Sequence, residues 1–339
     1  MGADAVTPTP ESEPVAPPVL SVRGLGVRFR MRGGRHIAAV TDATFDLAAG
    51  ECLALVGESG CGKSVLASAL LGLLPGNAQT TGAALLTGPD PAAPTDLLAA
   101  DERTLARTVR GRRIGLVPQS PATHLTPVRT VRSQLGEVLS ELTGARGPAL
   151  SKAAETAAGR ASFPADHLDR YPHELSGGLA QRAATALALI GDAPLLLADE
   201  PTTGLDRELV DRTADELRRH TDEGRALLMI THDLAAAERI ADRVAVMYAG
   251  RIVELSPAAR FFGDRGPRHP YARGLLDALP EREFTAIPGM PPELGDLPDG
   301  CAFAARCTRA TDVCAVLPAL TPGPGSSVAC HHAEERVDA

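Results

Sequence analysis

The chain has 339 residues, 44% of them hydrophobic, so it can hold one large domain with an appendage or two folding units. Its 34 Lys and Arg residues against 42 Asp and Glu residues give a net charge of −8, which argues against nucleic acid as a main partner. No apolar run approaches the roughly 20 residues of a membrane-spanning helix, so we do not expect the chain itself to cross a bilayer.

The first 18 residues are rich in Pro and in acidic side chains. Since they lack the basic and apolar regions of a secretory signal, we interpret residues 1–18 as a disordered tail in the cytosol. Short runs rich in β-branched residues then predict strands over residues 19–29, 36–47 and 51–57. A Gly-rich turn follows the last strand, and an apolar helical pattern covers residues 64–74.

Residues 122–186 have mostly helical patterns and predict a helical subdomain. After it, strands and helices alternate as in a parallel sheet, over residues 194–200, 207–220, 226–232, 233–240 and 243–250. The predicted fold class is therefore α/β. Beyond about residue 263 the composition shifts to Pro, Gly, Arg and Cys, so we assign residues 19–264 to one domain and residues 265–339 to a small, irregular appendage.

An eight-residue Gly-rich segment lies between the third strand and the first helix. It fits the pattern G-x-x-x-x-G-K-[ST], whose backbone N–H groups wrap phosphates at a helix N-terminus. In this pattern the lysine contacts the β and γ phosphates and the following hydroxyl binds Mg²⁺. The predicted nucleotide-binding residues here are Gly57, Glu58, Ser59, Gly60, Cys61, Gly62, Lys63 and Ser64. The Cys61 side chain occupies a variable position and is interpreted as incidental.

A second motif is the apolar strand that ends in Asp199 and Glu200. Such a strand end places the first carboxylate near the metal and the second next to the attacking water. We therefore predict Asp199 as a Mg²⁺ ligand and Glu200 as the general base. A solvated acidic pair would be the simpler interpretation, but not in a chain that also carries a phosphate loop. The two motifs together indicate an NTPase.

Leu175, Ser176, Gly177 and Gly178 precede a third helical pattern. Small residues at a helix start let the backbone approach a phosphate closely. One nucleotide needs no second phosphate loop from the same chain, so the residues alone leave open an ordinary N-cap turn. The order of the three motifs, however, resembles that of the ABC family of ATPases, in which LSGG is the signature. The resemblance implies that Ser176, Gly177 and Gly178 cover the γ-phosphate of ATP bound by an opposite subunit.

Three further residues match the same family in the expected order. The resemblance implies that Gln119 senses Mg²⁺ and couples to a membrane subunit, and that Asp206 belongs to the D-loop. It also implies that His232 contacts the γ-phosphate. One departure is Gly204, where the family often has Ala. The adenine-stacking residue stays unassigned, with Phe29, His36 and Ile37 as the candidates.

Longer phrases narrow the resemblance to the ATPases of oligopeptide, dipeptide and nickel importers. They include YPHELSGG, HPYARGLLDALP and IPGMPPELGDLPDGCAFAARC, and the match runs from about residue 19 to residue 330. The chain departs from these ATPases at Leu179 and Ala180, where Met and Arg are usual. The resemblance implies an ATP-hydrolysing subunit that powers import of peptides or a related small solute, including nickel or a metal chelate.

The same resemblance implies the setting of the chain. ATP and Mg²⁺ are the expected cofactors, and the cytoplasmic face of the membrane is the expected location. The expected partners are a second ATPase subunit, identical or homologous, two transmembrane permeases and an extracytoplasmic binding protein. The cargo is not determined. An alternative is a nucleic-acid-associated or translation-type ABC ATPase, but the insertion has no long coiled coil and each motif occurs once.

Four cysteines near the C-terminus have the spacing C-x5-C-x6-C-x15-C. In a reducing cytosol such a group indicates metal rather than disulfides. Four thiolates suit a four-iron four-sulfur cluster or a zinc ion, and the lack of a C-x-x-C pair argues against a zinc ribbon. Related importer ATPases carry a cluster here, so we expect the cluster, with zinc and unligated thiols as alternatives. The residues are Cys301, Cys307, Cys314 and Cys330. Their distance in sequence from the phosphate loop predicts a structural or redox-sensing role that spares nucleotide binding.

Overall fold

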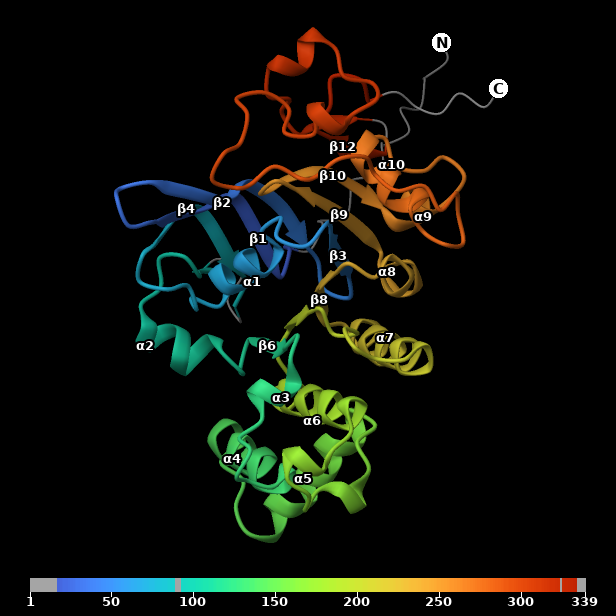
Figure 1. Ribbon diagram of the computed structural model, residues 1–339. Helices are drawn as coiled ribbons and strands as arrows, with labels where there is room; N and C mark the ends of the chain where they lie inside the picture. The colour runs from blue at the N-terminus through green and yellow to red at the C-terminus, as the bar shows by residue number, and fades with distance from the viewer. Residues whose placement is uncertain (1–16, 89–92, 324, 334–339) are drawn as a thin grey trace, which may run out of the picture.

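The computed structural model describes residues 17–88, 93–323 and 325–333. The predicted tail therefore lies outside the described residues, except for its last two positions. The chain forms two β-sheets, a helical subdomain at one end and an irregular C-terminal segment at the other (Figure 1). Among the described residues no helix is both long and apolar enough to cross a bilayer.

The smaller sheet is antiparallel. Its strands, in spatial order, are β2 (His36–Leu47), β1 (Leu20–Arg30), β4 (Ala78–Leu86) and β5 (Thr95–Asp96). The first two strands confirm the predicted ranges to within one residue. The sequence pattern did not predict β4, whose exposed, Thr-rich first half shows little apolar alternation.

The larger sheet has eight strands. Five of them run parallel, in the order β9 (Arg243–Tyr248), β3 (Cys52–Val56), β8 (Ala226–Thr231), β7 (Leu195–Asp199) and β6 (Ile114–Val117). Three antiparallel strands extend it beyond β9, namely β10 (Arg251–Pro257), β12 (Ser326–Val328) and β11 (Thr321–Gly323). The parallel strands are continuous apolar runs because both of their faces are covered.

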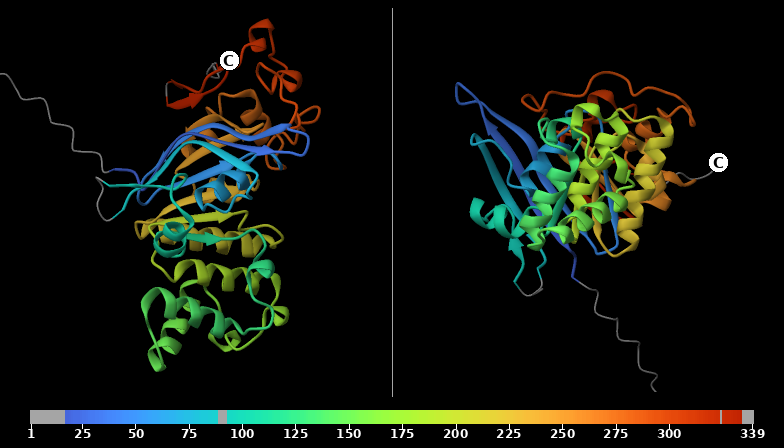
Figure 2. Two further views of the ribbon diagram at one scale, coloured as in Figure 1. Left: turned by 90° about the vertical axis from the view of Figure 1, so that its left-hand side faces the viewer. Right: turned by 90° about the horizontal axis from the view of Figure 1, so that it is seen from below.

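Helices cover the larger sheet and build the helical subdomain. Those next to the sheet are α1 (Lys63–Leu70), α7 (Arg207–Asp222) and α8 (Leu234–Ile240). The subdomain contains α3 (Pro121–His124), α4 (Val131–Thr143), α5 (Pro148–Arg160) and α6 (Gly177–Leu189), which lie together at the end remote from the C-terminal segment (Figure 2). The remaining helices are α2 (Glu102–Thr104), α9 (Ala258–Phe262) and α10 (Pro270–Asp277), with short π or 3₁₀ turns at Leu105–Val109, Ala165–His167, Pro172–Glu174, Ala304–Arg306 and Asp312–Ala315.

The helix after the phosphate loop is shorter than the apolar pattern predicts. It ends at Leu70, four residues before the predicted end at Leu74. Gly72 has a φ of +63°, and a Cβ at this position would lie 2.4 Å from Leu105. The chain therefore leaves the helix at a left-handed glycine, which the apolar pattern alone does not reveal.

The C-terminal segment does not form a separate core. Strand β12 pairs with β10, Glu254 opposite Val328, so the segment extends the main sheet. Tyr271 and Phe303 are buried in the same apolar cluster as the central strands. The sequence pattern also missed helix α10. A segment with few apolar residues gains more by docking on an existing core than by building its own, which explains this arrangement. The division at residues 264 and 265 stays a prediction.

Candidate nucleotide site

The phosphate loop connects β3 to α1 and packs closely against the backbones of β9 and β2. A Cβ on Gly57 would meet the carbonyl oxygen of Met247 at 2.2 Å, and one on Gly62 would meet that of Ala39 at the same distance. Both glycines also have positive φ, +154° and +108°. Only glycine satisfies both conditions, so these two positions let the loop lie this close to the backbones of β9 and β2.

Lys63 lies in the middle of this loop. Its Nζ donates hydrogen bonds to the carbonyl oxygens of Gly57, at 2.7 Å, and Glu58, at 3.1 Å. The residue is only 6% exposed. A positive charge is thus fixed at the N-terminus of α1, where backbone N–H groups also favour an anion. The sulfur of Cys61 lies 3.9 Å from the same Nζ, and burial raises the pKa of its thiol.

Ser64 and Asp199 lie side by side, although 135 residues separate them in sequence. The hydroxyl of Ser64 donates to Oδ1 of Asp199 at 3.1 Å. The contact arises because β3 and β7 flank β8, so their carboxyl ends meet at one edge of the sheet. Burial is the main cause that raises the pKa of Asp199. A hydroxyl and a carboxylate oxygen this close are the hard donors that Mg²⁺ takes.

Glu200 and His232 form the next pair at this edge. Nδ1 of His232 lies 2.6 Å from Oε2 of Glu200, and the backbone N–H of His232 donates to the same oxygen at 3.3 Å. The hydroxyl of Thr203 donates to it at 3.5 Å. The Glu200 side chain is 9% exposed and that of His232 is 62% exposed. The carboxylate is therefore held from one side while the imidazole faces outward.

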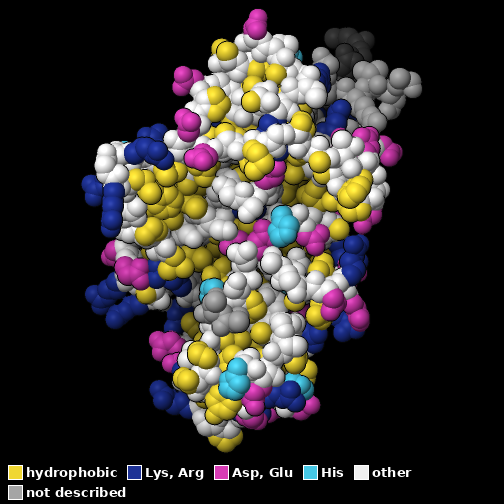
Figure 3. Space-filling view, in the orientation of Figure 1, with side chains coloured by type: hydrophobic (Ala, Val, Ile, Leu, Met, Phe, Trp, Pro, Cys, Tyr) yellow, Lys and Arg dark blue, Asp and Glu magenta, His cyan; other side chains and the backbone are white. Residues whose placement is uncertain are grey.

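Gln119 also reaches this edge of the sheet. It follows β6, which pairs in parallel with β7, Val117 opposite Ala198, and it is exposed. Acidic side chains and a histidine gather at the centre of the face shown in Figure 3, between the sheets and the helical subdomain. The parallel pairing of β6, β7 and β8 thus places the strand-end residues predicted from sequence at one edge of the sheet.

The signature residues lie elsewhere. Ser176 caps α6, its Oγ accepting the N–H of Leu179 at 3.4 Å, and Ser176 and Gly177 are exposed. Gly178 packs on α7, where a Cβ would meet Leu209 at 2.6 Å. The starts of α6 and α1 belong to different layers of the molecule (Figure 1). The signature and the phosphate loop of the same chain therefore belong to separate parts of the fold.

Asp206 caps α7, its Oδ1 accepting the N–H of Leu209 at 3.0 Å. Gly204, two residues earlier, has a φ of +75° and open space where a Cβ would point. A glycine relieves the strain that an alanine would carry in this conformation, which accounts for the departure from the family pattern. Both residues are exposed next to the signature helix.

The three adenine candidates lie at one end of the β1–β2 pair. Phe29 and Ile37 are partners in register and half-buried, and His36 is exposed. The C-terminal segment passes beside them, since a Cβ on Gly295 would lie 3.5 Å from Ile37. No one of the three is distinguished by these contacts.

The four C-terminal cysteines all lie in the irregular C-terminal segment. The N–H of Cys301 donates to the carbonyl oxygen of Cys314 at 2.9 Å. Burial raises the pKa of the Cys301 thiol, and the neighbouring Cys314, Cys330 and Cys307 thiols raise it further. In the part of the chain that the structure describes, however, no three His, Cys, Asp or Glu side chains are grouped so that they could hold a metal ion. The predicted centre is therefore not established by this arrangement.

The C-terminal region makes two contacts with the phosphate loop that the sequence did not predict. The hydroxyl of Tyr271 accepts the N–H of Glu58 at 2.8 Å, and Arg306 forms a salt bridge with the Glu58 carboxylate at 2.7 Å. More than 200 residues separate these partners. The only signal was that both residues lie in the phrases HPYARGLLDALP and CAFAARC, which the sequence analysis noted for their resemblance alone.

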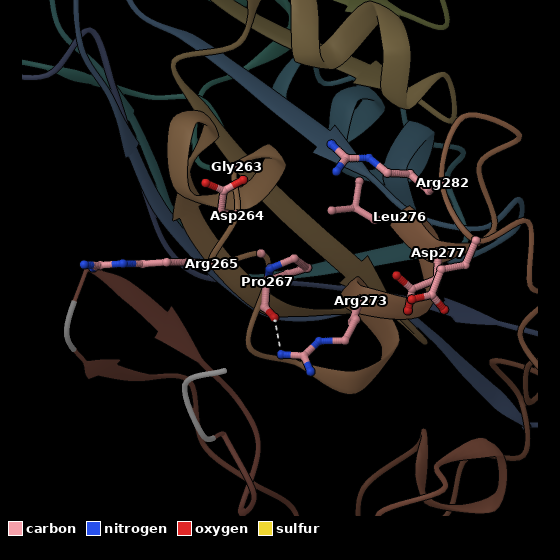
Figure 4. A pocket seen from close by; sticks show the side chains of 10 residues that line it. Gly263, Asp264, Arg265, Pro267, Arg273, Leu276, Asp277 and Arg282 are labelled. Carbon is pink, nitrogen blue, oxygen red and sulfur yellow. Dashed lines mark hydrogen bonds between the residues drawn. The ribbon is translucent and has the colours of Figure 1, made fainter. Parts of the chain in front are cut away.

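A cavity of about 510 Å³ lies beside α9 and α10. Side chains of both charges line it, and the guanidinium of Arg273 donates to the carbonyl oxygen of Pro267 at 3.2 Å (Figure 4). None of the residues predicted for the nucleotide site lines this cavity. The nucleotide site is thus defined by the strand ends, not by this hollow.

Comparison with known families gives two matches. Residues 40–203 match the ABC transporter family, and residues 253–314 match the C-terminal region of oligopeptide/dipeptide transporters. The first match contains the phosphate loop, the signature and the Asp199–Glu200 pair. The second contains three of the four cysteines, together with Tyr271 and Arg306.

Similar proteins cover nearly the full length. A putative peptide import ATP-binding protein of Brucella melitensis is 41% identical over 93% of this chain and 95% of its own length. The dipeptide transport ATP-binding protein DppD of Bacillus subtilis is 40% identical over 87% of this chain and 88% of its own length. The oligopeptide transport ATP-binding protein OppD of Salmonella typhimurium is 40% identical over 92% and 93%, respectively.

Solved structures agree on the fold. A dimeric ATP-binding cassette with ADP and phosphate bound aligns with a TM-score of 0.62 at 24% identity, covering 70% of this chain and 98% of that one. The cbiO1 subunit of Clostridium perfringens aligns with a TM-score of 0.61 at 26% identity, covering 73% and 92%.

Proposed function

The chain belongs to the ABC transporter family and is an ABC-type ATPase, and from that premise we propose that it powers the import of peptides. The observation that carries this proposal is the combination of a complete ATP-hydrolysis edge with a C-terminal region of the oligopeptide/dipeptide type. Proteins similar along almost the whole chain are named for peptide, dipeptide and oligopeptide transport. The nucleic-acid and translation alternative finds no support in these matches.

The proposed chemistry is phosphoryl transfer to water. Lys63 and the loop N–H groups hold the phosphates, and Ser64, Asp199 and Gln119 would hold Mg²⁺, which neutralises charge on the phosphate oxygens. The Glu200 carboxylate takes a proton from water as the water oxygen attacks the γ-phosphorus. The bond to the bridging oxygen then breaks, leaving ADP and phosphate. His232 orients Glu200 and reaches the γ-phosphate from its exposed position.

We propose that the site is completed by a second ATPase subunit. The signature residues Ser176, Gly177 and Gly178 begin α6, in a different layer from the phosphate loop of their own chain. Ser176, Gly177 and Asp206 are exposed. Two such chains placed head to tail would bring the signature of each onto the nucleotide of the other. Two permeases and an extracytoplasmic binding protein complete the proposed importer, with this chain on the cytoplasmic face of the membrane.

The test of peptide import is uptake by cells. Deleting the gene should abolish uptake of labelled di- to pentapeptides, and wild-type protein should restore it whereas Lys63→Ala should not. Lys152→Ala, an exposed lysine on α5, is the matched control and should restore uptake. Unchanged peptide uptake in the deletion strain, with loss of nickel uptake instead, would transfer the proposal to a metal cargo.

We also propose that Cys301, Cys307, Cys314 and Cys330 bind a four-iron four-sulfur cluster, with zinc as the alternative. Support comes from the spacing, from the neighbouring thiols that add to the effect of burial in raising the pKa of Cys301 and of Cys330, and from the backbone hydrogen bond between Cys301 and Cys314. A metal centre would bind the four residues as thiolates, because its positive charge offsets the repulsion between four negatively charged sulfurs. Likewise, residues 19–264 as the ATPase domain with residues 122–186 as its helical subdomain, and residues 265–339 as the C-terminal domain, remain our proposed division.

A further inference from the structure

Arg306 reaches from the cysteine-bearing segment to the phosphate loop. Its Nη1 donates to Oε2 of Glu58 at 2.7 Å and its Nη2 donates to Oε1 at 3.0 Å, a bidentate pair. Nη1 also donates to the hydroxyl of Tyr248 at 3.2 Å, and Nε donates to the carbonyl oxygen of Pro288 at 2.8 Å. Four bonds therefore fix this guanidinium in one orientation.

The surroundings of Arg306 are buried and aromatic. The Arg306 side chain is 4% exposed and lies 5.8 Å from the ring centres of both Tyr248 and Phe303. The ring of Tyr271 packs on that of Tyr248 at 4.4 Å. Only 3% of the residues in the chain are aromatic, yet several of them surround this one guanidinium, where their rings stabilise its positive charge.

The same aromatic group also holds the backbone of the loop. Tyr271, which is fully buried, accepts the N–H of Glu58 with its hydroxyl. Glu58 is thus held through its main chain by one residue of the C-terminal region and through its carboxylate by another. Neither contact involves the helical subdomain or the other strand-end residues.

Glu58 brings a negative charge into a loop that binds phosphates. Left alone, this carboxylate would repel the nucleotide and would have no fixed direction. We propose that Arg306 is a positioning residue for ATP binding, which neutralises Glu58 and anchors the phosphate loop to the C-terminal region. This inference rests on the proposed nucleotide site and adds a residue from outside its motifs.

The position of Arg306 also connects the cysteines to the phosphate loop. Arg306 ends the short turn Ala304–Arg306 and lies between Cys301 and Cys307. Disorder in that turn would therefore weaken the hydrogen bonds between Arg306 and Glu58. Under this proposal loss of order at the cysteines would weaken nucleotide binding through Arg306, whereas the sequence predicts a role of the cysteines that spares nucleotide binding; that expectation stays a prediction.

The test is a binding titration of the full-length protein with a fluorescent ATP analogue and Mg²⁺. Arg306→Met keeps the length and apolar contacts of the side chain but removes the charge, and should raise Kd by at least about tenfold. Adding Glu58→Gln to this variant removes the uncompensated carboxylate and should recover at least about threefold of the loss. Arg265→Met, an exposed arginine of the same region, is the matched control and should bind as wild type.

Two results would overturn the proposal. One is unchanged affinity in Arg306→Met, and the other is a double variant as weak as Arg306→Met, which would mean that Arg306 acts only through general packing. Lys63→Ala is measured in parallel, since its failure to weaken binding would reject the nucleotide site itself rather than the role of Arg306. Should Arg306→Met fail to fold, Arg306→Gln, which also lacks the charge, decides in its place, and wild-type affinity in that variant counts against the proposal.

Discussion

Nδ1 of His232 lies 2.6 Å from Oε2 of Glu200, across the neighbouring ends of β7 and β8. Glu200 has a φ of +49°, which a non-glycine residue adopts only when its surroundings hold it there. Its N–H donates to the carbonyl oxygen of Ile230 at 2.8 Å, and this bond fixes the turn. The direction of the candidate base is therefore set by β8 as well as by its own strand.

Replacing Glu200 by Gln should leave ATP binding intact and lower turnover by about 100-fold or more, because the base is lost while the phosphate contacts remain. It should also trap a closed pair of subunits. Steady-state hydrolysis with partner subunits present measures the rate, and nucleotide titration measures binding. Glu141→Gln on α4 is the control, since that carboxylate is exposed and far in sequence from the motifs. Near-normal turnover in Glu200→Gln would exclude Glu200 as the base.

Lys63→Ala should weaken nucleotide affinity by about tenfold or more as well as the rate, because its ammonium contacts phosphates already in the ground state. Equilibrium titration with an ATP analogue gives the affinity. Lys152→Ala, the other lysine of the chain, should bind like wild type. If Lys63→Ala also bound like wild type, ATP would have to lie elsewhere.

The isolated chain should hydrolyse ATP slowly, since its exposed signature lies in a different layer of the fold from its own phosphate loop. Activity per molecule should rise with protein concentration, and further when partner ATPase and permeases are added. Hydrolysis rate against concentration, with the oligomeric state followed by light scattering, tests this expectation. Full activity in a sample that scattering proves monomeric would contradict a shared site.

His269 should make stability depend on pH. It is 1% exposed, and burial lowers its pKa from 6.5 to about 4. Its Nδ1 accepts the N–H of Tyr271 at 3.1 Å at the start of α10, which only the neutral ring can do. The unfolded chain therefore binds more protons between about pH 4 and pH 6.5, so this contribution is complete above pH 6.5 and is lost as the pH falls towards 4.

The loss should amount to about 3 kcal/mol, the free energy that corresponds to lowering a pKa from 6.5 to about 4. Denaturant unfolding at several pH values measures it as the difference between wild type and His269→Asn, which keeps an acceptor but does not titrate. Burial raises the pKa of the Glu254 carboxyl, so this residue has the opposite effect on stability as the pH falls. Both proteins contain Glu254, so its effect cancels when the two stabilities are subtracted. Parallel stability curves for the two proteins from pH 7 to pH 4.5 would refute the assignment.

Anaerobically purified protein should contain iron and acid-labile sulfide in a 1:1 ratio. Chelation or a Cys301→Ser substitution should loosen the C-terminal segment, seen as faster proteolysis after residue 300, and should weaken nucleotide binding through Arg306. Zinc without sulfide would support the alternative. Neither metal, with all four thiols freely alkylated in the native protein, would leave the cysteines as plain thiols.

Features that depend only on residues close together in the chain could be predicted from the sequence. The phosphate loop, the strand that ends in Asp199 and the capped helix after Ser176 are local patterns, in which a glycine, a lysine or an apolar run has one physical use. Four strands of the main sheet, β3, β7, β8 and β9, followed from the same periodicity, whereas β6 and the three strands beyond β9 were not predicted. Their order along the chain was sufficient to indicate the family.

The contacts of the C-terminal region, in contrast, became apparent only from the tertiary structure. The sequence pattern suggested a separate appendage, but β12 joins the main sheet and Arg306 binds Glu58 across 248 positions of sequence. A lone arginine beside a cysteine carries no local sign of its partner, because the partner is set by how the sheet, α10 and the turn at Ala304–Arg306 pack. Periodicity reports which face of an element is buried, whereas packing of whole elements decides what that face meets.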